Sequence, residues 1–174
     1  EKKYCNAMIP KKIIQKCRRI KVVITDVDGV LTDGGMYFSE KGELLKKFNT
    51  RDGMAIELLH KFSIKSIFLT GENSKIVKAR ASKVRVDECY VNIKRKEVML
   101  SKICKKFNVK PDNVAYIGDD INDIKIMKLV GFSGSTSDST KEAKSVSDFI
   151  CKTKGGQGAL REFVDLILSA NGFI

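Results

Sequence analysis

Three aspartates, Asp26, Asp28 and Asp33, lie close together in the stretch ITDVDGVLTDGG, residues 24–35. The β-branched run before them is typical of a buried strand, so Asp26 and Asp28 fall at its carboxyl end. Neighbouring carboxylates repel each other there, and the arrangement is costly unless a cation binds them. Oxygen ligands of this kind favour Mg²⁺. Asp33 has a simpler interpretation, because aspartate is common in turns without any chemical role.

Two further strand-like runs, KSIFLTG and NVAYIGD, end in polar residues. The first ends with Thr70 and Gly71, and the second ends with Asp119. Ligands of open α/β sheets bind beyond the carboxyl ends of the strands, so we expect these residues to lie close to Asp26. Mg²⁺ keeps several waters and readily takes substrate phosphate as a ligand. A sparse carboxylate site therefore indicates phosphoryl chemistry.

A phosphate beside several carboxylates needs donors and a positive partner. The hydroxyl of Thr70 and the backbone N–H of Gly71 stand just before the next helix, where phosphate oxygens bind readily. Lys96 could supply the balancing positive charge. The alternative for Thr70 is a helix N-cap, a role for which Asn73 and Ser74 compete.

The whole chain shows the alternation of strands and helices that positions such a site, and predicts a doubly wound, mainly parallel α/β sheet with helices on both faces. Glycine at Lys41-Gly42 predicts a β-hairpin within residues 34–50. The expected strands are 20–26, 65–71, 88–91, 113–119, 131–134 and 148–151. The expected helices are 11–18, 52–62, 74–83, 95–107, 121–129, 139–145 and 157–170.

Length and composition bound the class of protein. The 174 residues, 43% hydrophobic and 31% charged, predict one globular domain over residues 8–174, without an apolar run of membrane-spanning length. Residues 1–7, ahead of Met8, are interpreted as an N-terminal extension of the kind an expression vector adds. Five scattered cysteines without C-x-x-C pairs argue against a disulfide framework or a zinc site and favour the cytoplasm.

The net charge of +12 raises the question of nucleic-acid binding. Basic residues are spread along the whole chain, aromatic residues make up only 7%, and tryptophan is absent. Without a basic stripe or stacking platforms, nucleic acid is not an expected partner.

The motifs DVDGVLTDG, LTGE, Lys96 and GDDINDIKIM resemble, in order and spacing, the four motifs of the haloacid dehalogenase superfamily of phosphotransferases. The resemblance implies a Rossmann-like fold in which Asp26 is the nucleophile and forms an aspartyl-phosphate. It implies that Asp28 serves as general acid and then as general base.

The same resemblance implies a metal site and a phosphate site. Mg²⁺ would be bound by Asp26, by the backbone carbonyl of Asp28 and by Asp119, with Asp120 and Asp123 orienting these ligands. The phosphoryl group would be bound by Thr70, Gly71 and Lys96.

Nearly the whole chain, from about Lys21 to Leu168, resembles the small, cap-less branch that contains 3-deoxy-D-manno-octulosonate 8-phosphate phosphatases and 2-keto-3-deoxynononate 9-phosphate phosphatases. Only a hairpin and one helix fit between Asp33 and Thr70, so no cap domain is expected. Members of this branch are homotetramers in which hairpins associate and neighbouring subunits complete each active site. The apolar stretch Met36–Phe38, which is poorly suited to free solvent, agrees with such an association.

The resemblance also points to residues that select the substrate. Those implied to contact the sugar acid are Asn49, Thr50, Arg51, Glu72, Arg80, Lys83 and Arg161. The octulosonate enzymes usually carry a basic residue after the TG pair, whereas Glu72 and Lys83 resemble the nononate enzyme. The segment NTRDG, residues 49–53, instead resembles the octulosonate group. We therefore expect a nononate 9-phosphate first and an octulosonate 8-phosphate second.

Two other classes of function stay open from the sequence. One is a non-catalytic tetramerisation module related to the C-terminal domain of CMP-sialic acid synthetases, in which the acidic residues can be missing. The other is a phosphatase acting on nucleic-acid ends, which only the charge suggests.

Several site residues also have ordinary structural interpretations. Lys94 and Arg95 precede Lys96 in what could be a solvated helix start. Asp120 and Asp123 could simply favour a helix N-terminus. The only histidine, His60, is expected to be structural, and the glycines of GGQG, residues 155–158, could separate two elements rather than bind substrate with Arg161.

Overall fold

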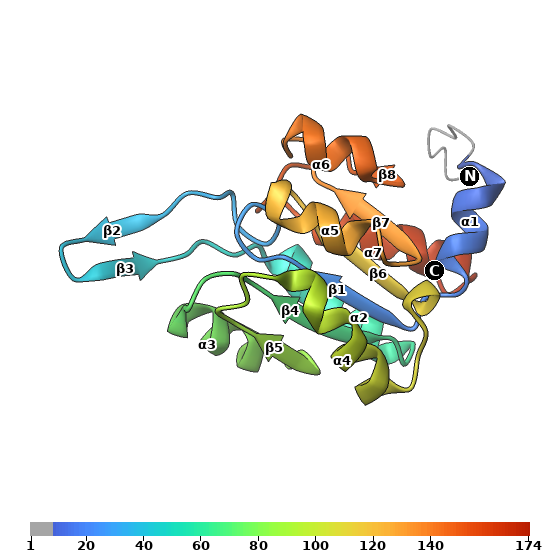
Figure 1. Cartoon of the computed structure of the whole chain (residues 1–174), viewed down its shortest axis with the longest axis horizontal. Coiled ribbons are helices and arrows are strands. Elements are labelled where there is room, and N and C mark those ends of the chain that lie inside the picture. Colours follow the sequence, from blue (N-terminus) through green and yellow to red (C-terminus); the bar gives the residue numbers. More distant parts are fainter. Residues whose placement is uncertain (1–8) are drawn as a thin grey trace.

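The computed structural model describes residues 9–174, and their centre is one six-stranded parallel sheet (Figure 1). The strands are β1 (Val22–Thr25), β4 (Lys65–Leu69), β5 (Glu88–Tyr90), β6 (Val114–Gly118), β7 (Phe132–Ser135) and β8 (Phe149–Ile150). Their order is β5-β4-β1-β6-β7-β8, and every neighbouring pair is parallel. Strand β1 therefore lies between β4 and β6. This confirms the expected doubly wound fold.

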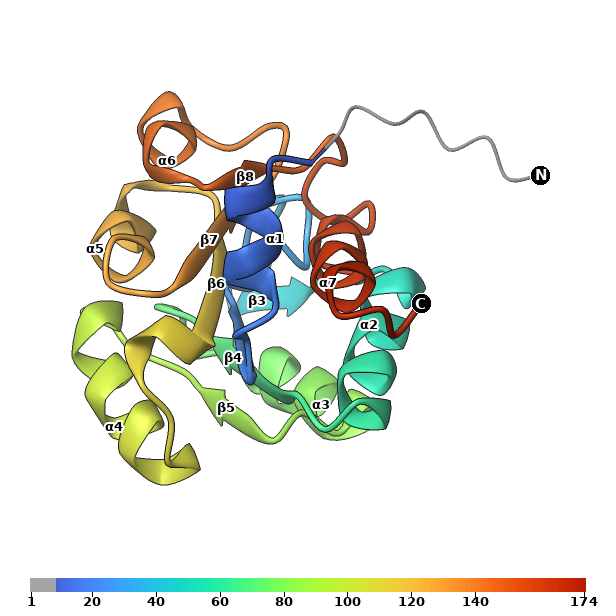
Figure 2. The same ribbon diagram turned by 90° about the vertical axis from the view of Figure 1, so that its right-hand side faces the viewer.

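Helices cover both faces of the sheet, as the view along the strands in Figure 2 makes plain. One face packs against α1 (Lys11–Cys17), α2 (Thr50–Lys61), α3 (Lys75–Val84) and α7 (Ala159–Ala170). The other packs against α4 (Met99–Phe107) and α5 (Ile124–Met127), and α6 (Lys141–Val146) lies beyond α5.

Alternation along β1 produces the two cores. Val23 faces the first core, whereas Val22 and Ile24 face the second. All three are at most 2% exposed, because a parallel strand covered by helices on both sides buries both sets of side chains.

The hairpin of β2 (Tyr37–Ser39) and β3 (Gly42–Leu45) extends away from the body of the molecule (Figure 1). Its turn falls at Glu40 and Lys41, as expected from the sequence, and Gly42 adopts a φ of +108°. Between Asp33 and Thr70 the chain forms this hairpin, α2 and β4.

Element boundaries differ from the expectation by one or two residues at most ends. Two expected helices begin with a 3₁₀ turn: η1 (Lys96–Val98) precedes α4, and η3 (Ile121–Asp123) precedes α5; a third 3₁₀ turn, η2 (Pro111–Asn113), leads into β6. At both starts a buried residue, Lys96 or Asp123, turns inward to form ion pairs. Residues 1–7 lie outside the described part of the chain. Within that part no helix combines the length and apolar character needed to cross a bilayer.

Candidate active site

The carboxyl ends of β1, β4 and β6 meet at one edge of the sheet, because these three strands are neighbours. Asp26 follows β1 directly, Thr70 follows β4, and Asp119 follows β6. A cavity of about 250 Å³ opens at this edge. It is lined by Asp26, Asp28, Thr70, Gly71, Glu72, Asp119, Asp120, Ile121 and Asn122. Residues far apart in the sequence are thus brought together as expected.

The loop after β1 is shaped by Gly29. Its φ of +87° lies in the left-handed region, and a Cβ at this position would come within 2.0 Å of Oδ2 of Asp119. The buried side chains of Val27 and Val30 anchor the loop on either side of this glycine. Glycine therefore lets the first acidic loop approach the third strand end.

Lys96 forms the electrostatic centre of the site. Its side chain is 1% exposed, and Nζ lies 2.7 Å from Oδ1 of Asp26 and 2.7 Å from Oδ1 of Asp123. Lys94 and Arg95, the other candidates, are exposed. Burial acts to lower the pKa of Lys96, but the two carboxylates outweigh it and raise the pKa above its usual value. The ammonium group is therefore charged at neutral pH.

Asp123 is a fully occupied acceptor. Oδ1 accepts from Lys96 Nζ and from the Tyr116 hydroxyl at 2.5 Å. Oδ2 accepts from the backbone N–H groups of Asp119 at 2.9 Å and Asp120 at 3.4 Å. Asp26, Asp119 and Asp123 have oxygens within 4.8 Å of one another, but four donors already surround the Asp123 carboxylate. It is thus suited to hold other groups rather than to bind a metal itself.

Asp26 has one occupied and one available oxygen. Oδ1 accepts from Lys96 Nζ and from the Val27 N–H at 2.7 Å. Oδ2 has no hydrogen-bond partner among residues 9–174, although the residue is only 4% exposed. Burial and the charge of Asp123 raise the pKa of Asp26 well above its usual value, while Lys96 opposes this rise.

Asp119 is the second aspartate, after Asp26, whose carboxylate has an oxygen without a protein partner in the described chain. Its carboxylate forms no hydrogen bond within the described chain, while its backbone carbonyl accepts from the Thr140 N–H at 2.9 Å. Burial, followed by the charges of Asp123 and Asp120, raises the pKa of Asp119 to about 7. Ionising this carboxyl beside its neighbours is therefore costly unless a further positive charge lies at the site.

These features fit a divalent cation. Asp26 and Asp119 offer carboxylate oxygens that have no protein partner in the described chain, and both side chains line the same cavity. Their raised pKa values reflect burial and a repulsion that a cation would relieve. An all-oxygen donor set with room for water and phosphate is typical of Mg²⁺.

Thr70 is 1% exposed, and its Oγ1 accepts from the Glu72 N–H at 3.1 Å. Because the oxygen acts as an acceptor there, the hydroxyl proton remains available for a ligand in the cavity. Ser74 rather than Thr70 or Asn73 is the N-cap of α3. The alternative interpretation of Thr70 as that cap is therefore wrong.

Asp28 lies across the cavity mouth and contacts a lysine that the sequence analysis did not single out. Its Oδ1 accepts from Nζ of Lys46, which also pairs with Oε1 of Glu43 at 2.5 Å. Burial acts to lower the pKa of Lys46, but hydrogen bonds with both carboxylates raise it above its usual value. Tyr116 was also missed, although a tyrosine in a buried strand signals a polar partner for its hydroxyl.

Of the residues expected to contact a sugar acid, only Glu72 lines the acidic cavity. Thr50, Arg51 and Lys83 are exposed, at the start of α2 and near the end of α3. Arg161 pairs with Asp165 at 2.7 Å on α7. Within a single chain these groups do not converge on Asp26.

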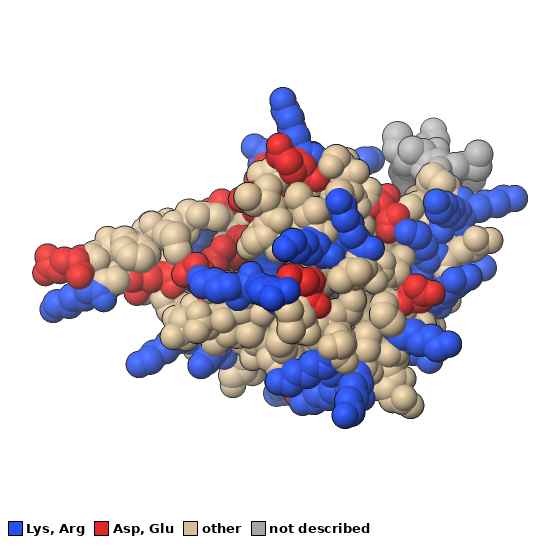
Figure 3. All heavy atoms as spheres, in the orientation of Figure 1, with Lys and Arg blue, Asp and Glu red and all other residues tan. Residues whose placement is uncertain are grey.

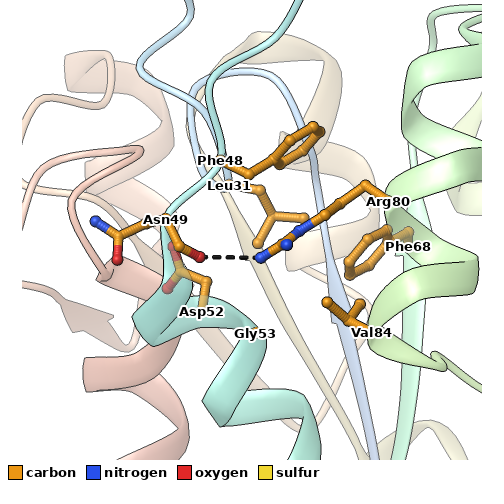
Figure 4. Close-up of a pocket in the computed structure, with 8 residues that line it drawn as sticks. All are labelled: Leu31, Phe48, Asn49, Asp52, Gly53, Phe68, Arg80 and Val84. Carbon is orange, nitrogen blue, oxygen red and sulfur yellow. Dashed lines mark hydrogen bonds between the residues drawn. The ribbon is translucent and has the colours of Figure 1, made fainter.

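Asn49 and Arg80 meet in a second, much smaller cavity between α2 and α3 (Figure 4). Arg80 donates to the Asn49 backbone carbonyl at 3.1 Å, and its guanidinium lies 5.4 Å from the centre of the Phe48 ring. The cavity measures about 10 Å³, which is room for a single water. It is too small for a sugar acid.

Asp52 borders the same small cavity and is 3% exposed (Figure 4). Its Oδ1 accepts from the Arg161 N–H at 3.0 Å, whereas Oδ2 is buried without a partner. Burial raises the pKa of Asp52 to about 6, against the opposing effects of the Arg161 N–H and of Arg80. This carboxylate is costly to ionise in the folded protein.

The remaining candidates have structural surroundings. Asp33 accepts from the Gly35 N–H in a turn. His60 contacts Ser66 and Asp87 at 3.2 Å, far from β1's carboxyl end. A Cβ on Gly155 would come within 2.0 Å of the Gly29 carbonyl oxygen, so the glycine run packs directly behind the loop after β1.

Comparisons with known proteins agree with this geometry. The family model of the haloacid dehalogenase-like hydrolases matches residues 69–163. The 3-deoxy-D-manno-octulosonate 8-phosphate phosphatase KdsC of Escherichia coli (strain K12) is 36% identical over 168 residues, which cover 97% of this chain and 89% of that protein.

Two solved structures have closely similar folds. The 3-deoxy-D-manno-octulosonate 8-phosphate phosphatase from Yersinia pestis superposes with a TM-score of 0.92 at 35% identity, covering 95% of this chain and 89% of that one. The enzyme from Moraxella catarrhalis, in complex with magnesium, phosphate and a KDO molecule, has a TM-score of 0.90 at 34% identity and covers 95% of both chains.

We predict that Asp123→Asn destabilises the protein by roughly 3 kcal/mol, as expected for breaking a buried ion pair. The amide N–H₂ group of asparagine would face either Lys96 and Tyr116 or the two backbone N–H groups, and these are all donors. Urea unfolding of the purified variant measures the loss. Asp120→Asn is the matched control, because Asp120 is exposed and asparagine caps a helix equally well. Equal stability of the two variants would contradict the role given to Asp123.

We predict that Asp52→Asn changes how stability depends on pH. The folded pKa of about 6 exceeds the ordinary value of 3.8, so the contribution of Asp52 to stability falls as the pH rises from about 4 to about 6. The variant should therefore gain about 2 kcal/mol relative to wild type between pH 4 and pH 8. Unfolding free energies at both pH values, with exposed Asp112→Asn as a control for charge removal, measure this difference. If the unfolding free energies of variant and wild type differ by the same amount at pH 4 and pH 8, the raised pKa of Asp52 is contradicted.

Proposed function

This chain belongs to the haloacid dehalogenase-like hydrolase family and is a phosphoric monoester hydrolase, and from that premise we propose that it removes the terminal phosphate of a 2-keto-3-deoxy sugar acid. The substrate class is taken from the matched relatives, whose names state that they act on an octulosonate 8-phosphate. The acidic residues whose loss marks a non-catalytic module are present, so that alternative is not favoured.

In the proposed mechanism the carboxylate of Asp26 attacks phosphorus. Lys96 and the Val27 N–H hold its Oδ1 and so fix the side chain at the cavity, and this anchored carboxylate is the observation that carries the proposal. The new P–O bond forms as the bond from phosphorus to the sugar oxygen breaks, which gives an aspartyl-phosphate.

Asp28 is proposed to donate a proton to the departing sugar oxygen. It then accepts a proton from the water that attacks the phosphorus, so that inorganic phosphate leaves and the Asp26 carboxylate is regenerated. Asp28 lines the same cavity as Asp26, and its Oδ2 is buried without a partner.

Asp26, Asp119 and the backbone carbonyl of Asp28 are the proposed ligands of Mg²⁺. The ion would supply positive charge against the phosphoryl oxygens and the two carboxylates. Asp123 and Asp120 would orient the ligands, and the hydrogen bonds from the Asp119 and Asp120 N–H groups to Asp123 support this role.

Thr70, Gly71 and Lys96 are the proposed binding groups for the transferring phosphoryl oxygens. Lys96 Nζ has three N–H bonds and donates to two carboxylates, which leaves one donor for the phosphate. The Thr70 hydroxyl and the Gly71 N–H face it from the end of β4.

A nononate 9-phosphate is the proposed preferred substrate, with the octulosonate 8-phosphate second. Glu72 lines the acidic cavity at the position where octulosonate enzymes usually carry a basic residue. Lys83 supports the same choice through its resemblance to the nononate enzyme, whereas the names of the matched relatives favour the octulosonate.

A homotetramer is the proposed assembly. Tyr37, Phe38 and Leu45 of the hairpin are 56%, 65% and 62% exposed, a large apolar surface for an isolated arm. Figure 3 shows uncharged atoms along the upper side of this arm, with charged side chains at its tip and acidic ones along its lower edge. In such an assembly each subunit would bring its substrate-contacting residues toward the acidic cavity of a neighbour; these are Asn49, Thr50, Arg51, Arg80, Lys83 and Arg161.

A cytoplasmic location is proposed as well. Cys17, Cys89, Cys104 and Cys151 are unpaired in the described chain, which suits a reducing compartment. Lys and Arg are scattered over the face in Figure 3 rather than gathered in a stripe, so nucleic acid remains a disfavoured partner.

We predict that Asp26→Asn lowers phosphatase turnover by about 10³-fold or more, because the amide cannot form the phosphoenzyme. We also predict that EDTA abolishes wild-type activity and that Mg²⁺ restores it. Release of inorganic phosphate measures both effects, and Asp33→Asn, in a turn outside the cavity, is the matched control. Full activity of Asp26→Asn would contradict the nucleophile, and activity that withstands EDTA would contradict the metal.

We predict a higher kcat/KM for the nononate 9-phosphate than for the octulosonate 8-phosphate. The variant Glu72→Arg should shift this ratio about tenfold or more toward the octulosonate, since a basic residue then replaces the carboxylate at the cavity. Steady-state kinetics with both esters provide the ratio. A preference for the octulosonate in the wild type would overturn the proposed order, and an unchanged ratio in Glu72→Arg would remove Glu72 as the selector.

A further inference from the structure

Lys46 is a buried lysine that the proposed mechanism does not use. It lies just after β3, where the hairpin returns to the body of the molecule (Figure 1). Its side chain is 0% exposed and its ammonium group is enclosed between the carboxylates of Asp28 and Glu43. A lysine is buried only at considerable cost unless it is paired in this way, so its placement calls for an explanation.

The pairing fixes the side chain of Asp28. Oδ1 is held by Lys46, and Oδ2 is left buried without a partner in a residue that lines the acidic cavity. A carboxylate anchored through one oxygen presents the other in a defined direction. Without Lys46, the Asp28 side chain would be free to leave that orientation.

Glu43 extends the contact to the other side of the cavity. Its second oxygen, Oε2, accepts from the Ser74 hydroxyl at 3.0 Å, and Ser74 is the N-cap of α3. Helix α3 directly follows the Thr70–Glu72 segment. A continuous polar chain thus runs from Asp28, in the loop after β1, through Lys46 and Glu43 of the hairpin segment, to Ser74 at the start of α3.

We propose that Lys46, held by Glu43, is the positioning residue that orients Asp28 toward the leaving oxygen of the substrate. This inference rests on the proposed function, because it takes Asp28 to be the general acid. Lys46 touches neither the phosphoryl group nor the reacting oxygens and acts only through Asp28.

The leaving group separates positioning from mere structural support. A sugar alkoxide needs a proton as it departs, whereas 2,4-dinitrophenolate departs without one. Because kcat/KM reports on steps up to formation of the phosphoenzyme, loss of the oriented acid should lower kcat/KM for the sugar ester alone. Structural damage would lower kcat/KM for both esters.

The experiment compares wild type with Lys46→Met, Asp28→Asn and Lys47→Met. The substrates are 2,4-dinitrophenyl phosphate and whichever sugar-acid phosphate wild type hydrolyses faster. Lys46→Met should lose about ten- to a hundredfold in kcat/KM with the sugar ester and less than about threefold with the aryl ester. Lys47→Met is the matched control, since Lys47 is 57% exposed and pairs only with Asp33. It should resemble wild type.

Glu43→Gln is a second variant in case Lys46→Met does not fold. It keeps the shape of the side chain but removes the charge that holds Lys46, so a smaller loss confined to the sugar ester is expected. Suppose that Asp28→Asn shows the selective loss, but that the Lys46 and Glu43 variants lose kcat/KM equally with both esters or lose none. This result would overturn the positioning role and leave the general acid in place. An Asp28→Asn variant that keeps full activity with both esters would refute the general acid itself, and the positioning role with it.

Discussion

The ammonium group of Lys96, buried between Asp26 and Asp123, is the interaction on which the rest of the site depends. Removing these charges from water costs several kcal/mol per ion, and the cost is met only through close pairing and further hydrogen bonds. Asp123 supplies those bonds through Tyr116 and two backbone N–H groups. With Asp119 added, three carboxyl groups face one lysine, so a second cation would lower the cost of ionising them.

The same interaction gives different roles to three aspartates, Asp26, Asp119 and Asp123. Four donors surround the Asp123 carboxylate, which therefore has a structural role. Asp26 and Asp119 keep carboxylate oxygens that can still accept a bond from a group in the cavity. Proximity alone would assign all three aspartates to a metal. Counting lone pairs separates the groups that hold the site from those that can react.

The alternation of strands and helices, and the meeting of Asp26, Thr70 and Asp119 at one edge of the sheet, followed from the sequence because they depend on local patterns. A β-branched run predicts a strand, and in a parallel sheet its carboxyl end lies with the others at one edge. The inward turn of Lys46 carries no such signal, because it depends on Asp28, 18 residues earlier, and on Glu43. The burial of Asp52 and the contact of Arg80 with Asn49 depend likewise on how α2 and α3 pack, which periodicity does not specify.

The hairpin explains how a small fold compensates for having no lid. The chain between Asp33 and Thr70 is short, yet β3 and the residue after it bring Glu43 and Lys46 against Ser74 and Asp28. The exposed Leu44 and Leu45 lie between these two residues, so the apolar arm and the polar contacts belong to one element. Any contact that fixes the hairpin in an assembly would therefore also restrict the side chain of Asp28 through Lys46. The geometry of the site would then depend on the assembly.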